Sequence, residues 1–327
     1  MEKSGEKEKI MVHTINVEER RFVYGEFLTI NLSNGEIEEL PYVLIGGDHG
    51  LNAMVSIGSI VYVVGGLELE DGKKASIKPS NSRVNNKKEF LYHHGMSFID
   101  LNSSNSGWKS APCYRDTPDY YSTSVSLGGK IYSFGGSDYA GIFDPVVQNW
   151  ETLLPPPEAG LFDIDTLTEV IADPDNNRLL VFFPDPICGY FAYYPDENRW
   201  ERDVNSLPWS PKHILVADGG LFFIYVPKFP NVFKVYDSVA HQWLNVEFTV
   251  PFSMWRYKFE AMVYLGNHLI CLLADFPTHG GDKNITNVFL CKFRFVRSPT
   301  HLIFTVFPIE TYPLKSRCTS IASYLPI

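Results

Sequence analysis

An internal repeat constrains the fold of this chain more than any other feature of its sequence. Residues 52–66 read NAMVSIGSIVYVVGG, and residues 122–136 read STSVSLGGKIYSFGG. Each segment predicts two short apolar strands around a glycine-containing turn, followed by two adjacent glycines. Because one such unit cannot bury its apolar faces alone, the repetition predicts several similar sheets packed against one another.

A second element follows the strand pairs. Four short segments each precede a tryptophan: residues 98–100 before Trp108, residues 143–145 before Trp150, residues 193–195 before Trp200 and residues 235–237 before Trp243. The spacing is similar in three units, and the unit before Trp108 carries two extra residues. The period of about 43–50 residues fits a four-stranded propeller blade and not a helical solenoid. We expect structural roles here: glycine permits a sharp turn, and the tryptophan packs between neighbouring blades.

The hydrophobic run, the diglycine and the spaced Tyr and Trp together resemble the kelch repeat. The match is best at residues 52–157 and weaker afterwards, where residues 183–184, 226–227 and 274–275 replace the diglycine. The resemblance implies a single β-propeller domain over residues 1–327. It specifies a fold and not an activity.

The two ends of the chain complete the predicted ring. Residues 9–41 predict two or three strands, and residues 318–326 predict a lone strand without partners after it. Pairing these strands makes one blade from both ends and removes exposed sheet edges. The other blades fall near residues 51–112, 113–157, 158–207, 208–249 and 250–315. We therefore predict an all-β, six-bladed kelch-type β-propeller, closed by pairing of the C-terminal strand with the N-terminal strands.

Charge and composition narrow the class of protein. The net charge is −10, with 28 Lys and Arg against 38 Asp and Glu, which argues against nucleic acid as a partner. No apolar run approaches the length of a membrane span, so no membrane is expected as a partner. Five scattered cysteines without a C-x-x-C pair favour reduced thiols. We expect a cytoplasmic protein, with the nucleus as a second compartment.

Two segments are predicted to lack fixed structure. Residues 1–8 are charged and polar, and they predict a disordered tail. Residues 67–90 include a basic stretch rich in Ser and Asn, and they predict a flexible insertion within the first complete blade.

Aromatic and charged residues gather in the loops predicted for one face of the propeller. In an antiparallel blade, the loop entering the first strand and the loop joining the second and third strands share a face. Rigid scaffolds carry function on such loops, and Trp, Tyr and Arg dominate binding energy. The predicted ligand-binding residues are Arg115, Tyr120, Tyr121, Asp138, Tyr139, Asp185, Trp255, Arg256, Tyr257 and Glu260.

The densest part of this set is the run Trp255-Arg256-Tyr257 with Glu260. In one interpretation, Arg256 gives a ligand bidentate hydrogen bonds and the two rings stack on it. In the other, Arg256 and Glu260 pair with each other or with neighbours and serve only the fold. The sequence leaves both interpretations open.

A metal site is not expected. Small plant kelch proteins include the specifier proteins, which are similar in architecture and carry the iron motif Glu-x-x-x-Asp-x-x-x-His. Here Glu260, Tyr264 and His268 have that spacing, so the aspartate is missing. Along one strand, Glu260 and His268 would also lie about 26 Å apart. We expect no cofactor, and the N-terminal tail is too short for an F-box.

Two functions follow as alternatives. The leading one is a kelch-type recognition module that binds a protein partner or a small-molecule ligand on its loop-rich face. The other is an enzyme or reaction-steering protein of plant specialised metabolism with a polar-aromatic pocket at the propeller mouth. Such an enzyme would be a cofactor-independent lyase, isomerase or cyclase that uses acid–base chemistry. A carboxylate of raised pKa in a deep apolar pocket would favour chemistry, and a broad charged face would favour partner binding.

Overall fold

The computed structural model of this chain is all-β, and no α-helix occurs among the residues it describes. Those residues are 9–18, 22–40, 53–64, 96–103, 107–112, 123–134, 140–156, 169–182, 190–203, 213–226, 232–249, 261–277, 285–315 and 320–327. Within these ranges, no helix has the length and hydropathy of a membrane-spanning segment. The predicted tail 1–8 and the predicted insertion 67–90 lie outside the described residues.

Three four-stranded antiparallel sheets follow one another along the chain, each with its strands in sequence order. The first contains β4 (Ala53–Ile57), β5 (Ile60–Val64), β6 (Met96–Asp100) and β7 (Lys109–Ala111). The second contains β8 (Thr123–Leu127), β9 (Lys130–Phe134), β10 (Ala140–Asp144) and β11 (Asn149–Leu153). The third contains β12 (Glu169–Asp173), β13 (Arg178–Phe182), β14 (Tyr190–Tyr194) and β15 (Arg199–Asp203). These strands agree with the predicted repeat.

A larger sheet of nine strands follows. Its first half contains β16 (His213–Ala217), β17 (Leu221–Val226), β18 (Val232–Asp237) and β19 (Gln242–Phe248). Its second half contains β20 (Ala261–Gly266), β21 (Leu269–Pro277), β22 (Ile285–Arg297), β23 (His301–Val306) and β24 (Glu310–Lys315). The halves join because β19 and β23 pair in parallel, with Asn245 opposite His301 and Phe248 opposite Phe304. The repeat pattern does not predict this link.

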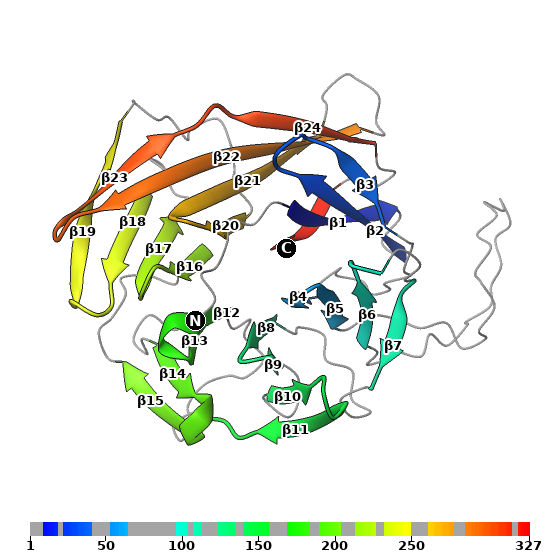
Figure 1. Cartoon of the computed structure of the whole chain (residues 1–327), viewed down its shortest axis with the longest axis horizontal. Helices are drawn as coiled ribbons and strands as arrows, with labels where there is room; N and C mark the ends of the chain where they lie inside the picture. The colour runs from blue at the N-terminus through cyan, green and yellow to red at the C-terminus, as the bar shows by residue number, and fades with distance from the viewer. Residues whose placement is uncertain are drawn as a thin grey trace, which may run out of the picture.

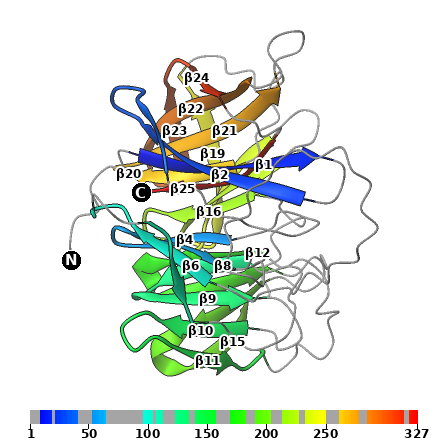
Figure 2. The same cartoon turned by 90° about the vertical axis from the view of Figure 1, so that its right-hand side faces the viewer.

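Strands from distant parts of the sequence form the remaining sheet. Its order is β25 (Ser320–Pro326), β1 (Lys9–Glu18), β2 (Phe22–Asn31) and β3 (Ile37–Glu39). The pairing of β1 with β25 is antiparallel, with Ile10 opposite Pro326 and Ile15 opposite Ser320. Figure 2 shows these two strands side by side. The predicted pairing of the C-terminal strand with the N-terminal strands is therefore present in the structure.

The sheets are arranged around a common centre, with one strand of each four-stranded sheet, and one of each half of the nine-stranded sheet, on the inside (Figure 1). Each inner strand contacts the next, in the order β4, β8, β12, β16, β20, β25 and back to β4. Apolar clusters fill the spaces between neighbouring sheets: Phe182 and Tyr190 of one sheet pack with Phe222 and Ile224 of the next. Burying a side chain such as Phe222 contributes about 1.5–3 kcal/mol. The core is thus divided among the sheet interfaces.

The aspartate that recurs before three of the four tryptophans shapes a turn. In Asp100, Asp144 and Asp237, the Oδ1 atom accepts a hydrogen bond from the backbone N–H two residues further on, at 3.0, 2.9 and 3.1 Å. Such a bond lets a short polar side chain replace a backbone partner at the turn. This explains why Asp ends the third strand in three of the four units.

Two of the recurring tryptophans, Trp150 and Trp200, connect neighbouring sheets. Trp150 Nε1 donates to the carbonyl oxygen of Pro112 at 2.8 Å, and Trp200 Nε1 donates to that of Leu154 at 3.0 Å. Pro112 follows β7 and Leu154 follows β11, so each carbonyl belongs to the preceding sheet. The tryptophans therefore add a directional bond to the packing role predicted for them.

The turn glycines Gly128 and Gly129 have the conformation that the repeat pattern predicts. Gly128 and Gly129 between β8 and β9 have φ of +58° and +77°, as a tight hairpin turn requires. The diglycines at residues 65–66 and 135–136 lie outside the described residues.

Candidate functional site

All ten residues predicted to bind a ligand fall in four segments outside the described part of the chain. Those segments are 113–122, 135–139, 183–189 and 250–260. The prediction for Arg115, Tyr120, Tyr121, Asp138, Tyr139, Asp185, Trp255, Arg256, Tyr257 and Glu260 therefore stays a prediction. The described strand ends that flank these segments can nevertheless be located.

These strand ends meet at one end of each sheet. In the second sheet, Thr123 at the start of β8 pairs with Phe134 at the end of β9, which pairs with Ala140 at the start of β10. In the third sheet, Glu169 pairs with Phe182, and Phe182 pairs with Tyr190. We call this the loop-side end: the end where the first strand begins and the second strand finishes.

Glu169 is the functional candidate at the loop-side end that sequence reasoning missed. It is the first residue of β12, and its Oε1 atom accepts a hydrogen bond from the backbone N–H of Ile214, near the start of the neighbouring β16, at 3.4 Å. Burial raises the pKa of Glu169 to about 8, and the bond from Ile214 acts in the opposite direction. A carboxyl group with this pKa is largely protonated at neutral pH.

The surroundings of Glu169 explain why its pKa is raised. Phe182 and Tyr190 share its row in the sheet, and both are buried, with ring centroids 5.2 Å apart. Ile171, two residues along β12, packs on the same apolar cluster. Among the described residues, no Lys, Arg or His forms an ion pair or hydrogen bond with Glu169. The charged form is therefore disfavoured by lost hydration without a compensating cation.

His13 is a second buried titratable group. It lies in the middle of β1, fully buried, and its ring stacks on Phe27 with centroids 4.6 Å apart and planes 8° apart. Neither ring nitrogen has a hydrogen-bond partner within the described ranges. Burial lowers the pKa of His13 to about 4, so the imidazole is neutral near pH 7. A neutral stacked ring acts as part of the core.

Ion pairs at the opposite end of the sheets serve the fold. Asp173 is buried and accepts a hydrogen bond from Arg178 Nε at 2.8 Å, while Arg178 Nη2 donates to Ser238 Oγ at 3.3 Å. Ser238 follows β18 in the next sheet. Asp175 Oδ2 likewise accepts the backbone N–H of Gly219 at 2.7 Å. These contacts connect neighbouring sheets.

The residues at the spacing of the iron motif do not form a metal site in the described part of the chain. Tyr264 lies in β20, and His268 lies in the following turn, where its backbone N–H donates to the Tyr264 hydroxyl at 3.2 Å. His268 Nδ1 lies 3.1 Å from Asp218 Oδ1. Glu260 falls outside the described residues. Across those residues, no three His, Cys, Asp or Glu side chains are placed to share a metal ion.

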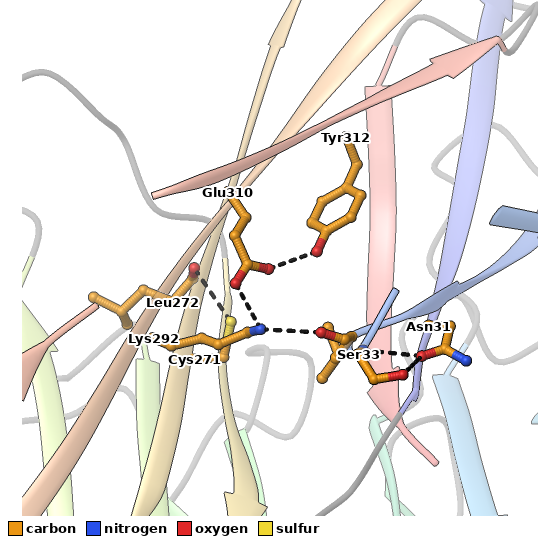
Figure 3. Close-up of polar contacts among 8 residues, drawn as sticks. Asn31, Ser33, Cys271, Leu272, Lys292, Glu310 and Tyr312 are labelled. Atoms are coloured by element: carbon orange, nitrogen blue, oxygen red, sulfur yellow. Dashed lines mark hydrogen bonds and ion pairs between the residues drawn. The ribbon is translucent and has the colours of Figure 1, made fainter. Parts of the chain in front are cut away.

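A polar network between the sheet of β1–β3 and that of β20–β24 surrounds Lys292 (Figure 3). Lys292 Nζ donates to Glu310 Oε1 at 2.8 Å and to the carbonyl oxygen of Leu32 at 3.4 Å. The Tyr312 hydroxyl donates to Glu310 Oε2. Burial first, and then the bond to Glu310, raise the pKa of Tyr312. Burial also raises the pKa of the neighbouring Cys271 thiol, which makes it a poor nucleophile.

Sequence relatives agree with the repeat. The F-box/kelch-repeat protein At4g39550 of Arabidopsis thaliana is 26% identical over 207 residues, which cover 60% of this chain and 43% of the relative. At1g61540 of the same plant, also named as an F-box/kelch-repeat protein, is 27% identical over 253 residues, covering 72% of this chain and 58% of that protein. No protein-family model matches the chain. The relatives support the predicted class of kelch-repeat protein.

The chain spans only about half the length of these relatives: 58% of At1g61540 and 43% of At4g39550. Among solved structures, the one titled YCF48 bound to D1 peptide has a TM-score of 0.47 and 13% identity, over 92% of this chain and 85% of that one. The class therefore depends on the repeat and on the sequence relatives.

Proposed function

We propose that this chain is a six-bladed kelch-type propeller that acts as a recognition module and binds a protein partner at its loop-side end. The cycle of contacts through the inner strands and the pairing of β25 with β1 support six blades and a closed ring. In this count, the two halves of the nine-stranded sheet are two blades. Kelch-repeat relatives suggest a protein-interaction role.

One observation carries the binding proposal. The four segments that contain the ten predicted binding residues all join described strands at the loop-side end. These segments are rich in Tyr, Trp, Arg and Asp, and such residues supply most of the binding energy of protein interfaces. A rigid set of sheets with recognition residues on the connecting loops is a common arrangement for binding.

The experiment is selection of peptides from a displayed library on the full chain, followed by affinity measurement. We expect Arg256→Ala and Trp255→Ala to weaken binding of the selected peptides about tenfold or more. Val146→Ala, at an exposed turn on the opposite end, is the matched control and should bind as the native chain does. Equal affinities for all three variants would place the binding surface elsewhere and contradict the proposal.

Acid–base catalysis is the second candidate, and Glu169 is the observation that favours it. A carboxyl group with a pKa of about 8 can donate a proton near neutral pH. Such chemistry also needs a second titratable group within reach of the substrate. Glu169 has only the Ile214 N–H as its partner among the described residues, so recognition is the better-supported function.

A further inference from the structure

Glu169 combines three properties that a purely structural residue does not need. It stands at the loop-side end, where β12 and β16 begin next to each other. The residue as a whole is partly exposed to solvent. Within the described ranges, its single hydrogen bond is the long one from the Ile214 N–H, which leaves Oε2 without a partner.

The packing around Glu169 is apolar, and this makes a missing counter-charge costly. Val170 and Ile171 follow it on β12, and Phe182 and Tyr190 lie beside it in the sheet. A carboxylate in such a place is stable only when a cation or several hydrogen-bond donors compensate for its lost hydration. The described part of the chain supplies neither.

We propose that the Glu169 carboxylate is the binding site for a cationic side chain, arginine or lysine, of a peptide partner at the loop-side end. This inference rests on the proposed recognition function and adds the chemistry of the residue that is recognised. The net charge of −10 favours approach of a cationic partner. A guanidinium fits a carboxylate with two parallel hydrogen bonds, and it also packs against aromatic rings such as those near Glu169.

Binding of a cation must then displace a proton. Burial raises the pKa of Glu169 to about 8, and a guanidinium interacts favourably only with the ionised form. The ionised fraction of the free protein rises from about 1% near pH 6 to about 50% near pH 8. Affinity should therefore rise about 50-fold over this interval, together with release of close to one proton near the lower pH.

Two other titratable residues stand at the loop-side end beside Glu169. Tyr190 pairs with Phe182 in the same row of the sheet, and His213 is the first residue of β16, directly before Ile214. Of these residue types, only histidine ordinarily titrates between pH 6 and pH 8. His213→Gln therefore separates the titration of that imidazole from the titration of Glu169.

The test uses the full chain and two peptide libraries that differ at one position. One library has a fixed central arginine, and the other has citrulline, which keeps the shape and removes the charge. We expect the arginine library to bind at least about tenfold more tightly, and Glu169→Gln to abolish the difference and the pH dependence. Glu39→Gln, an exposed glutamate on β3, is the matched control and should retain both.

The outcomes separate this inference from the function on which it rests. If both libraries bind equally well and Glu169→Gln has no effect, peptide recognition stands and the cation site is wrong. If neither library binds, both the recognition function and the cation site are wrong. Retention of the pH dependence in Glu169→Gln but not in His213→Gln would assign the effect to His213 and overturn the inference.

Discussion

Replacing Glu169 by Gln should make the stability of the protein less dependent on pH. Burial raises the pKa of Glu169 from the ordinary 4.5 to about 8 in the folded chain. Between these values the folded state holds a proton that the unfolded state has lost. The stability contributed by this proton is complete below about pH 4.5 and is lost as pH rises through about 8.

The magnitude follows from the difference between the two pKa values. At 1.36 kcal/mol for each pKa unit, the difference between 8 and 4.5 corresponds to about 5 kcal/mol. Because Glu169 is partly exposed, solvent screens its charge, and we expect about 2–3 kcal/mol. Glutamine keeps the acceptor for the Ile214 N–H and cannot ionise, so Glu169→Gln should avoid this loss.

The assay is urea unfolding, followed by tryptophan fluorescence, at a series of pH values from 5 to 9. The quantity to compare is the free energy of unfolding of the native chain minus that of Glu169→Gln. We expect this difference to fall by about 2–3 kcal/mol across the series, whereas that for the exposed control Glu39→Gln should stay constant. A difference for Glu169→Gln that does not change with pH would refute the argument.

Three further changes test the fold. Trp150→Phe removes the Nε1 bond to Pro112 and keeps an aromatic ring, so urea unfolding should show a loss of about 1 kcal/mol; an unchanged midpoint would mean that this bond adds nothing. Arg178→Met leaves the Asp173 carboxylate buried without its guanidinium and should cost about 3 kcal/mol in the same assay. Adding Asp173→Asn to Arg178→Met should restore part of this loss, and no restoration would contradict the ion-pair argument. Because the pKa of His13 is lowered to about 4, the native chain should lose stability as pH falls from about 6.5 towards 4. His13→Phe should reduce that loss when melting temperatures at pH 7 and pH 5 are compared, and equal losses in both proteins would refute it.

Much of the fold could be predicted because the repeat is tied to local chemistry. A glycine turn such as Gly128-Gly129 has a positive φ that only a few residue types adopt readily, so the turn is visible in the sequence. Asp144 caps a turn two residues away, and Trp150 reaches the preceding sheet from a similar place in the unit as Trp200. These short-range requirements leave a residue pattern that recurs.

The parts that were missed depend on contacts between distant segments. Parallel pairing of β19 with β23 is set by the tertiary arrangement of Asn245 and His301, which are far apart in the sequence. In the sequence, His13 is a polar position within a strand. Its burial against Phe27 becomes apparent only when the sheets are packed.

The candidate site also depends on a contact between distant segments, which the sequence alone does not show. Glu169 begins an ordinary apolar strand, and nothing in its neighbours along the sequence separates it from the other glutamates. Its distinction comes from the start of β16, which brings the Ile214 N–H to its side chain. A search of the sequence for acidic residues at strand starts, opposite the start of the next inner strand, could have selected it.

The pairing of β1 with β25 has a consequence for synthesis of the protein on the ribosome. One edge of β1, the first described strand, pairs only with β25, so it can form its hydrogen bonds only after residues 320–326 have been synthesised. During translation, that edge is open to pairing with other chains, and closing it requires a contact between the two most distant strands. Molecules interrupted shortly before β25 should therefore depend on chaperones more than any that have completed it.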